Sequence, residues 1–211
     1  MEAPTTTSEV PSVKTSIVFI LDRSGSMQDC RSDTIGGFNA FIEEQKKVKA
    51  DVCTMTLVQF DHEILTVFED RPIAEVVELT TETFVPRGNT ALLDAIGTTI
   101  KVTDAKKLDG NIVFAIMTDG HENASRTYTS PHIKDLITER EKGNWSFVFL
   151  AANQDAITSA AHLGIHMESA CTFSTDKARE QCTVLSGAIT KTRGITGAKV
   201  AFTPEDRGKT Q

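Results

Sequence analysis

The chain has 211 residues and a formal net charge of -7, and 39% of its residues are hydrophobic. The acidic balance argues against nucleic-acid binding, which needs a concentrated basic face. No apolar run approaches the roughly 20 residues that cross a bilayer, so the sequence predicts no membrane span. The length and the ordinary hydrophobic content suit one globular α/β domain.

Two features of the sequence indicate a cytoplasmic protein. The first residues, 1–14, are rich in Thr, Ser and Pro and lack the apolar core of a signal peptide, so we expect a flexible N-terminal segment. The four cysteines form no C-x-x-C pair, and scattered thiols are typical of a reducing compartment.

The predicted elements alternate between strand and helix. An apolar run over 16–22 predicts the first strand, and helical spacing of apolar residues predicts a helix over 31–50. The strand-like runs 52–60 and 63–68 are separated only by Asp61 and His62. Because this connection is too short for a parallel crossover, we expect an antiparallel hairpin there.

The rest of the chain continues the alternation. We expect helices over 90–107, 131–142, 154–163 and 176–192, and strands over 111–118, 145–152 and 165–173. The predicted domain spans 15–193, and residues 194–211 are expected to form a poorly ordered tail.

This order of elements predicts an α/β fold: a doubly wound, mostly parallel sheet with one antiparallel edge strand and helices on both faces. In such sheets, ligands bind outside the carboxyl ends of the strands, where the strand order reverses.

Oxygen-bearing side chains gather at those strand ends. Asp22, Ser24 and Ser26 end or follow the first predicted strand, Thr90 opens the predicted helix 90–107, and Asp119 follows the predicted strand 111–118. We predict that these five side chains converge from three loops into a metal site. Oxygen ligands suit Mg²⁺, Mn²⁺ or Ca²⁺ and argue against Zn²⁺.

The pattern Asp-x-Ser-x-Ser over 22–26, followed by Thr90 and by Asp119 in a Thr-Asp-Gly turn, resembles the metal-ion-dependent adhesion site (MIDAS) of von Willebrand factor type A (VWA) domains. The resemblance covers about 15–173. It implies the Rossmann-like VWA fold, with the strands that end at Asp22 and Asp119 side by side. It also implies that a bound Mg²⁺ or Mn²⁺ accepts an Asp or Glu carboxylate from a partner protein.

The sequence therefore predicts an intracellular, stand-alone protein-binding module and not an enzyme. One alternative is a metal-dependent, phosphatase-like hydrolase, although a haloacid-dehalogenase-like enzyme needs a second Asp where this chain has Ser24. The other is a regulatory subunit of an AAA+ ATPase or of a stress- or tellurite-resistance complex, as intracellular members of the family suggest.

Two expectations concern how a partner would be bound. Loop residues around the predicted site could contact a partner: Arg23, Gln28, Asp29, Asp61, His62, His121, Glu122 and Asn123. In family members that switch, partner binding displaces the C-terminal helix, which here is the predicted helix 176–192. The alternative is that this helix closes the core and does not move.

Overall fold

A computed structural model describes residues 13–152, 156–174 and 177–209. Its centre is a six-stranded sheet in the order β3-β2-β1-β4-β5-β6. The strands are β1 (Lys14–Asp22), β2 (Val52–Phe60), β3 (Ile64–Pro72), β4 (Asn111–Thr118), β5 (Trp145–Ala152) and β6 (Ala170–Phe173). All neighbouring strands are parallel except β2 and β3. The predicted mostly parallel sheet with one antiparallel edge strand is confirmed.

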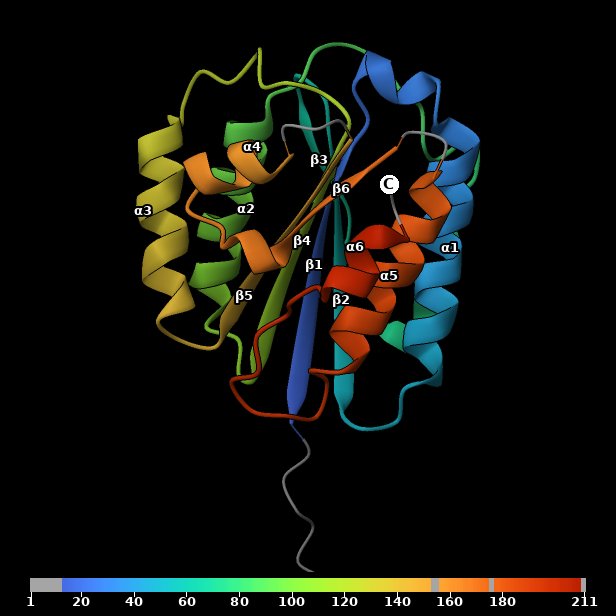
Figure 1. The fold of residues 1–211 in the computed structure, drawn as a ribbon, viewed down its shortest axis with the longest axis vertical. Coiled ribbons are helices and arrows are strands. Elements are labelled where there is room, and N and C mark those ends of the chain that lie inside the picture. The colour runs from blue at the N-terminus through green and yellow to red at the C-terminus, as the bar shows by residue number, and fades with distance from the viewer. Residues whose placement is uncertain (1–12, 153–155, 175–176, 210–211) are drawn as a thin grey trace, which may run out of the picture.

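Helices cover both faces of this sheet, as predicted (Figure 1). They are α1 (Arg31–Lys47), α2 (Leu92–Lys106), α3 (Ser130–Glu141), α4 (Ala156–His162), α5 (Ala178–Thr190) and α6 (Pro204–Gly208). Helices α1, α5 and α6 lie on one face, and α2, α3 and α4 lie on the other (Figure 1). The first residues of the predicted helices 154–163 and 176–192 lie outside the described residues.

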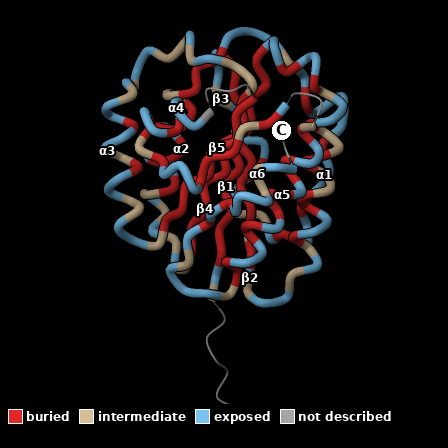
Figure 2. The backbone as a smooth tube through the Cα atoms, in the orientation of Figure 1, coloured by how far each residue is buried: buried red, intermediate tan, exposed pale blue. Residues whose placement is uncertain are grey.

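The central strand β1 is buried on both sides because its side chains alternate between two cores. Ile17, Phe19 and Leu21 pack in the core beneath α1 and α5. Val18 and Ile20 pack in the core beneath α2 and α3. Figure 2 shows the buried backbone concentrated along the strands between the two helical layers. A continuous apolar run in the sequence thus becomes a strand without a solvent face.

The sheet places the predicted site at one edge. From β1 the chain crosses to β2 on one side, and later to β4 on the other, so the strand order reverses between β1 and β4. Leu21 pairs with Met117 at the carboxyl ends of these two parallel strands. The loops after β1 and β4 therefore leave the sheet next to each other, as open α/β folds require of a ligand crevice.

The predicted strand 165–173 is too long. Only Ala170–Phe173 pairs with β5, because Met167–Ser169 forms a short 3-10 turn ahead of it. The turn is held by the C-terminal chain: the amide of Phe202 donates to the carbonyl of Glu168 at 2.8 Å.

The C-terminal residues also differ from the expected poorly ordered tail. Val200 and Phe202 are buried in the core beneath α1 and α5. Thr203 and Asp206 form a capping box at the start of α6. The two apolar side chains are too isolated in the sequence to show helical or strand periodicity, so their burial is not evident from pattern alone.

Across the described part of the chain, no helix is long and apolar enough to cross a membrane.

Candidate metal centre

Asp22 is fixed at the end of β1 by hydrogen bonds to both of its carboxylate oxygens. The amide of Ser24 donates to Asp22 Oδ1 at 2.6 Å, which closes the turn after the strand. Thr118, the last residue of β4, donates its hydroxyl to Asp22 Oδ2 at 2.5 Å. Asp22 is fully buried. Its carboxylate thus connects the ends of the two strands.

The two serines of the motif are presented by a tight turn. After Ser24 the chain enters a 3-10 helix, Gly25–Gln28. Ser24 Oγ and Ser26 Oγ lie 3.1 Å apart, and Ser26 Oγ donates to Asp119 Oδ1 at 2.7 Å. The hydroxyls after β1 and the carboxylate after β4 therefore form one cluster.

Thr90 reaches this cluster from a third loop. Its amide donates to Asn123 Oδ1 at 2.9 Å, and its carbonyl accepts from the amide of Asn123 at 3.0 Å. The loop after β4 thereby holds Thr90 in place. The structure brings all five sequence-predicted residues together at the carboxyl edge of the sheet.

Gly120 shows how closely the oxygens converge. A Cβ atom built on this glycine would lie 3.0 Å from Thr90 Oγ1, 3.4 Å from Ser26 Oγ and 3.6 Å from Ser24 Oγ. The three hydroxyls therefore surround one small space beside Asp119, which only a residue without a side chain leaves open.

Burial disfavours negative charge at both acidic residues. Burial raises the pKa of Asp22 to about 6, despite the hydrogen bonds that it accepts from Thr118 and Ser24. Burial also raises the pKa of Asp119, and the nearby Asp29 adds to this effect, although Ser26 donates to the carboxylate. A cation between these groups would relieve this cost.

The residues present fit a hard divalent cation. Every side chain in the cluster offers oxygen, which such ions prefer, and because residue 120 is glycine, no side chain from this position enters the space that the hydroxyls face. Asp22, Ser24, Ser26, Thr90 and Asp119 are the residues that would hold the ion.

A second group of charged residues supports the cluster from the side of β2. Asp61, at the end of β2, is fully buried and lies 3.1 Å from Arg23 Nε. Arg87 Nε donates to the same Asp61 oxygen at 2.8 Å. Both Arg23 and Asp61 were expected around the rim of the site, where a partner could touch them. Their burial gives them an internal role instead.

Asp61, His62 and Glu63 also place possible ligand atoms within 4.8 Å of one another. Two guanidinium groups already neutralise the carboxylates of this cluster, because Arg87 also pairs with Glu63. The Asp61 cluster therefore suits a cation less well than the hydroxyl cluster does.

The other rim residues divide into two kinds. Those with exposed side chains are Gln28, Asp29, His62, His121 and Asn123. Glu122 is half-buried and accepts hydrogen bonds from the amides of Leu93, Ala124 and Ser125 and from the Ser125 hydroxyl. Glu122 thus braces its loop rather than facing a partner.

Sequence analysis gave no supporting role to three residues that shape the site. Thr118 and Gly120 flank Asp119 in the Thr-Asp-Gly turn. Thr118 donates a hydrogen bond to Asp22, and Gly120 leaves space beside the hydroxyl cluster. Their position in the motif was the available signal. Asp61 carried no such signal, because its role depends on two arginines from other loops.

Comparison with known proteins gives the fold but no close relative. No family model matches the chain, and no curated protein matches it. The chain has the fold of VWA domains. A structure of proximal thread matrix protein 1 from the mussel byssus, with a zinc-occupied MIDAS motif, superposes with a TM-score of 0.61 at 16% identity, covering 82% of this chain and 47% of that one.

Two further structures have the same fold. A von Willebrand factor type A protein from Catenulispora acidiphila gives a TM-score of 0.58 at 13% identity, covering 85% of this chain and 43% of that one. Manganese-loaded TRAP protein from Plasmodium vivax gives a TM-score of 0.57 at 13% identity, covering 81% of this chain and 72% of that one. The chain thus spans about half the length of the mussel and Catenulispora structures.

Proposed function

We propose that the hydroxyl cluster binds one divalent cation, Mg²⁺ or Mn²⁺, and that the protein is a cytoplasmic binding module that docks an Asp or Glu side chain of a partner protein through this ion. The observation that carries the proposal is the convergence of the Ser24, Ser26 and Thr90 hydroxyls around one space beside Asp119. The cytoplasmic location is supported by the four cysteines, which are all free and buried.

The donor set favours an acidic partner. Three of the five side chains are neutral hydroxyls, so the site offers the cation fewer charged ligands than a cage built of carboxylates would. When bound, the ion supplies a coordination position that attracts a further oxygen anion. Around it, the protein contributes fixed oxygen atoms, and Ser26 and Asp29 lie at the exposed edge.

Geometry speaks against the hydrolase alternative. A phosphatase of that type needs an aspartate oxygen free to attack phosphorus. Asp22 is fully buried, and both of its oxygens accept hydrogen bonds. The position two residues later is Ser24, which cannot act as a carboxylic general acid. A binding role uses the same residues without these requirements.

Calorimetry on chelator-treated protein tests the metal site directly. Titration with Mg²⁺, Mn²⁺, Ca²⁺ and Zn²⁺ should show one site, with Mg²⁺ or Mn²⁺ bound. Ser26→Ala should weaken binding by about tenfold or more, in the range seen for changes around metal sites. Ser32→Ala, an exposed serine on α1, is the matched control. Unchanged affinity in Ser26→Ala, or no binding of Mg²⁺ and Mn²⁺, would contradict the proposal.

The docking step needs a second measurement. Capped peptides that contain one Asp or one Glu should be tried in turn; at least one kind should bind, only with metal present, and its Asn or Gln counterpart should not bind. A phosphate-ester or peptide hydrolysis activity that is lost in Asp22→Ala would support the hydrolase instead.

A further inference from the structure

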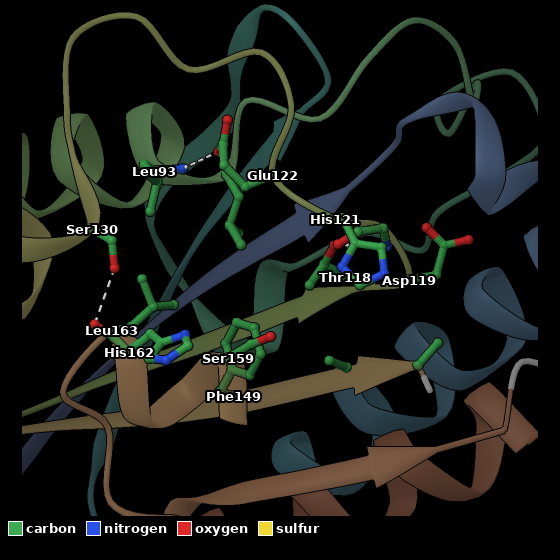
Figure 3. A pocket seen from close by; sticks show the side chains of 14 residues that line it. Leu93, Thr118, Asp119, His121, Glu122, Ser130, Phe149, Ser159, His162 and Leu163 are labelled. Carbon is green, nitrogen blue, oxygen red and sulfur yellow. Dashed lines mark hydrogen bonds between the residues drawn. The ribbon is translucent and has the colours of Figure 1, made fainter. Parts of the chain in front are cut away.

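A cavity opens beside the hydroxyl cluster, between the ends of β4 and β5 and helix α4. Its volume is about 250 Å³. Figure 3 shows His121 reaching it from the loop after β4, and Ser159 and His162 reaching it from α4. Pockets for drug-sized ligands measure about 300–1,000 Å³, so this one suits a smaller group, such as one large side chain.

The cavity lies next to the candidate metal centre. Thr118, Asp119 and Gly120 all line it. Asp119 accepts from Ser26 in the hydroxyl cluster, and Gly120 faces the three hydroxyls. The same three residues therefore border both spaces, so neighbouring residues of one ligand segment are the natural candidates to fill them.

The inner wall of the cavity is apolar. It includes Leu92, Phe149, Ala151 and Leu163, all of which are buried. These side chains come from the start of α2, from β5 and from the end of α4. Covering this wall with an apolar group is favourable because apolar surface is removed from water. Burying a charged group against it is costly.

Three of the polar groups that line the cavity already have partners inside the protein. Glu122 accepts four hydrogen bonds from its own loop and from Leu93. Thr118 donates its hydroxyl to Asp22. Ser130 donates to the carbonyl of His162 at 3.1 Å, which Figure 3 marks with a dashed line. At these three groups a polar guest would have to compete with existing hydrogen bonds.

We propose that this cavity is a subsite for an aromatic side chain of the protein partner, borne by a residue directly next to the acidic residue that docks at the metal centre. The subsite rests on the proposed function, because the carboxylate brings the aromatic group to the cavity. An aromatic ring buries a large apolar area with few rotatable bonds, and the exposed rings of His121 and His162 offer it further contact.

Capped peptides test the subsite. In the first series, a Phe stands directly before or after a single Asp, and in the second an Ala replaces that Phe. With Mg²⁺ present, at least one Phe peptide should bind about ten- to a hundredfold more tightly than its Ala counterpart, as expected for burial of one large apolar side chain. Equal affinity in the two series would overturn the subsite and leave the docking function intact.

A cavity-filling variant locates the effect. Ser159→Phe places a ring in the cavity, whereas Thr158→Phe adds the same ring at an exposed position of the same helix. Circular dichroism and Mg²⁺ titration show whether each variant is folded. The advantage of Phe over Ala should vanish in Ser159→Phe and persist in Thr158→Phe.

The remaining outcomes are distinct. A Phe advantage that survives in a folded Ser159→Phe variant would overturn the subsite, because the ring would then bind elsewhere. If no Asp or Glu peptide binds with metal present, the docking function fails, and the subsite fails with it.

Discussion

Arg23 Nε lies 3.1 Å from Asp61 Oδ2, and this buried ion pair ties the loop after β1 to the end of β2. Arg87 donates to the same oxygen, and its amide donates to the carbonyl of Arg23 at 2.8 Å. Asp61 also accepts at its carbonyl from the amide of Ala91, next to Thr90. One carboxylate thus connects the loop that carries Ser24 and Ser26 with the loop that carries Thr90, and it holds both loops in place.

Asp61→Asn removes the charge from this brace. Because Arg23 then stays buried without its anionic partner, we expect the free energy of unfolding to fall by about 3 kcal/mol, as measured by urea denaturation. Glu63→Gln is the control: Glu63 is exposed and pairs with Arg87 at the surface, so the loss of its charge should cost less than about 1 kcal/mol. Equal losses of stability in the two variants would show that Asp61 does not hold the two loops together.

Metal binding should stabilise the fold through the acidic residues. Mg²⁺ at about a hundred times its dissociation constant should raise the free energy of unfolding by roughly 2.7 kcal/mol. Asp119→Ala should abolish this gain. Because burial and Asp29 both raise the pKa of Asp119, its charge is unfavourable without metal, and Asp119→Ala should be no less stable than wild type in chelator. Denaturation with and without Mg²⁺ measures both effects, and retained stabilisation in the variant would remove Asp119 from the site.

Gly120→Ala tests whether the space between the hydroxyls is the metal position. Gly120 lies outside the left-handed region, so alanine suits its backbone, but the new methyl group would lie 3.0 Å from Thr90 Oγ1. We expect metal affinity to fall by about ten- to a hundredfold in calorimetry. Gly36→Ala on α1 meets no atom within 4 Å, so it should leave affinity unchanged and stabilise the helix by about 0.5–1 kcal/mol.

Most of the fold follows from the sequence because its strands are continuous apolar runs. The predicted strands 111–118 and 145–152 coincide with β4 and β5, and the hairpin of β2 and β3 follows from the shortness of its connection. The shortened β6 and the packed C-terminal residues could not be predicted in this way. They depend on contacts between segments about thirty residues apart, such as Ser169 with Val200.

The candidate site shows the same division. Its five oxygen-bearing residues could be named from the sequence, because each stands at a strand end or helix start within a recognisable motif. The chain could not reveal the brace around Asp61, since salt-bridge partners leave no local pattern. The cavity beside Asp119 could not be predicted from the sequence either, because its wall combines residues of α2, β5 and α4, which meet only in the folded protein.

Asp94 should make stability depend on pH. Burial alone would raise the pKa of Asp94, but backbone amides of Arg126, Tyr128 and Thr127 donate to the carboxylate and hold its pKa below the usual value. Because the pKa of Asp94 is lower in the folded state, its ionised carboxylate stabilises the fold at pH values above the unfolded-state pKa. This contribution is lost as pH falls through the folded-state pKa. Asp94→Asn should therefore cost about 1–3 kcal/mol at neutral pH and less in acid.

Urea denaturation of wild type and Asp94→Asn, at neutral pH and at a series of acidic pH values, measures the effect. Asp135→Asn, which changes an exposed carboxylate on α3, is the control and should show little difference at any pH. A cost for Asp94→Asn that stays constant into acid would show that the charge of Asp94 does not stabilise the loop.

The end of α5 is held in a way that opposes a switch. Arg193 and Asp51 form an ion pair in which both side chains are fully buried. Gln45 of α1 donates to the carbonyl and hydroxyl of Ser186 in α5. Sliding α5 along the sheet would have to break these contacts, and breaking a buried ion pair costs about 3–5 kcal/mol. We therefore expect partner binding to leave α5 in place.

A disulfide between α1 and α5 tests this expectation. A Cβ atom at Gly37 would lie 3.0 Å from Cys182 Sγ, so Gly37→Cys can form a disulfide with the native Cys182. The site is crowded, with the carbonyl of Ala178 at 2.9 Å, and Gly37→Ser controls for that crowding. Oxidised and reduced Gly37→Cys should bind a capped Asp peptide with equal affinity in the presence of Mg²⁺. Because coupling requires two states of different affinity, a change of more than a few-fold on oxidation, absent from Gly37→Ser under the same conditions, would show that α5 moves when the partner docks.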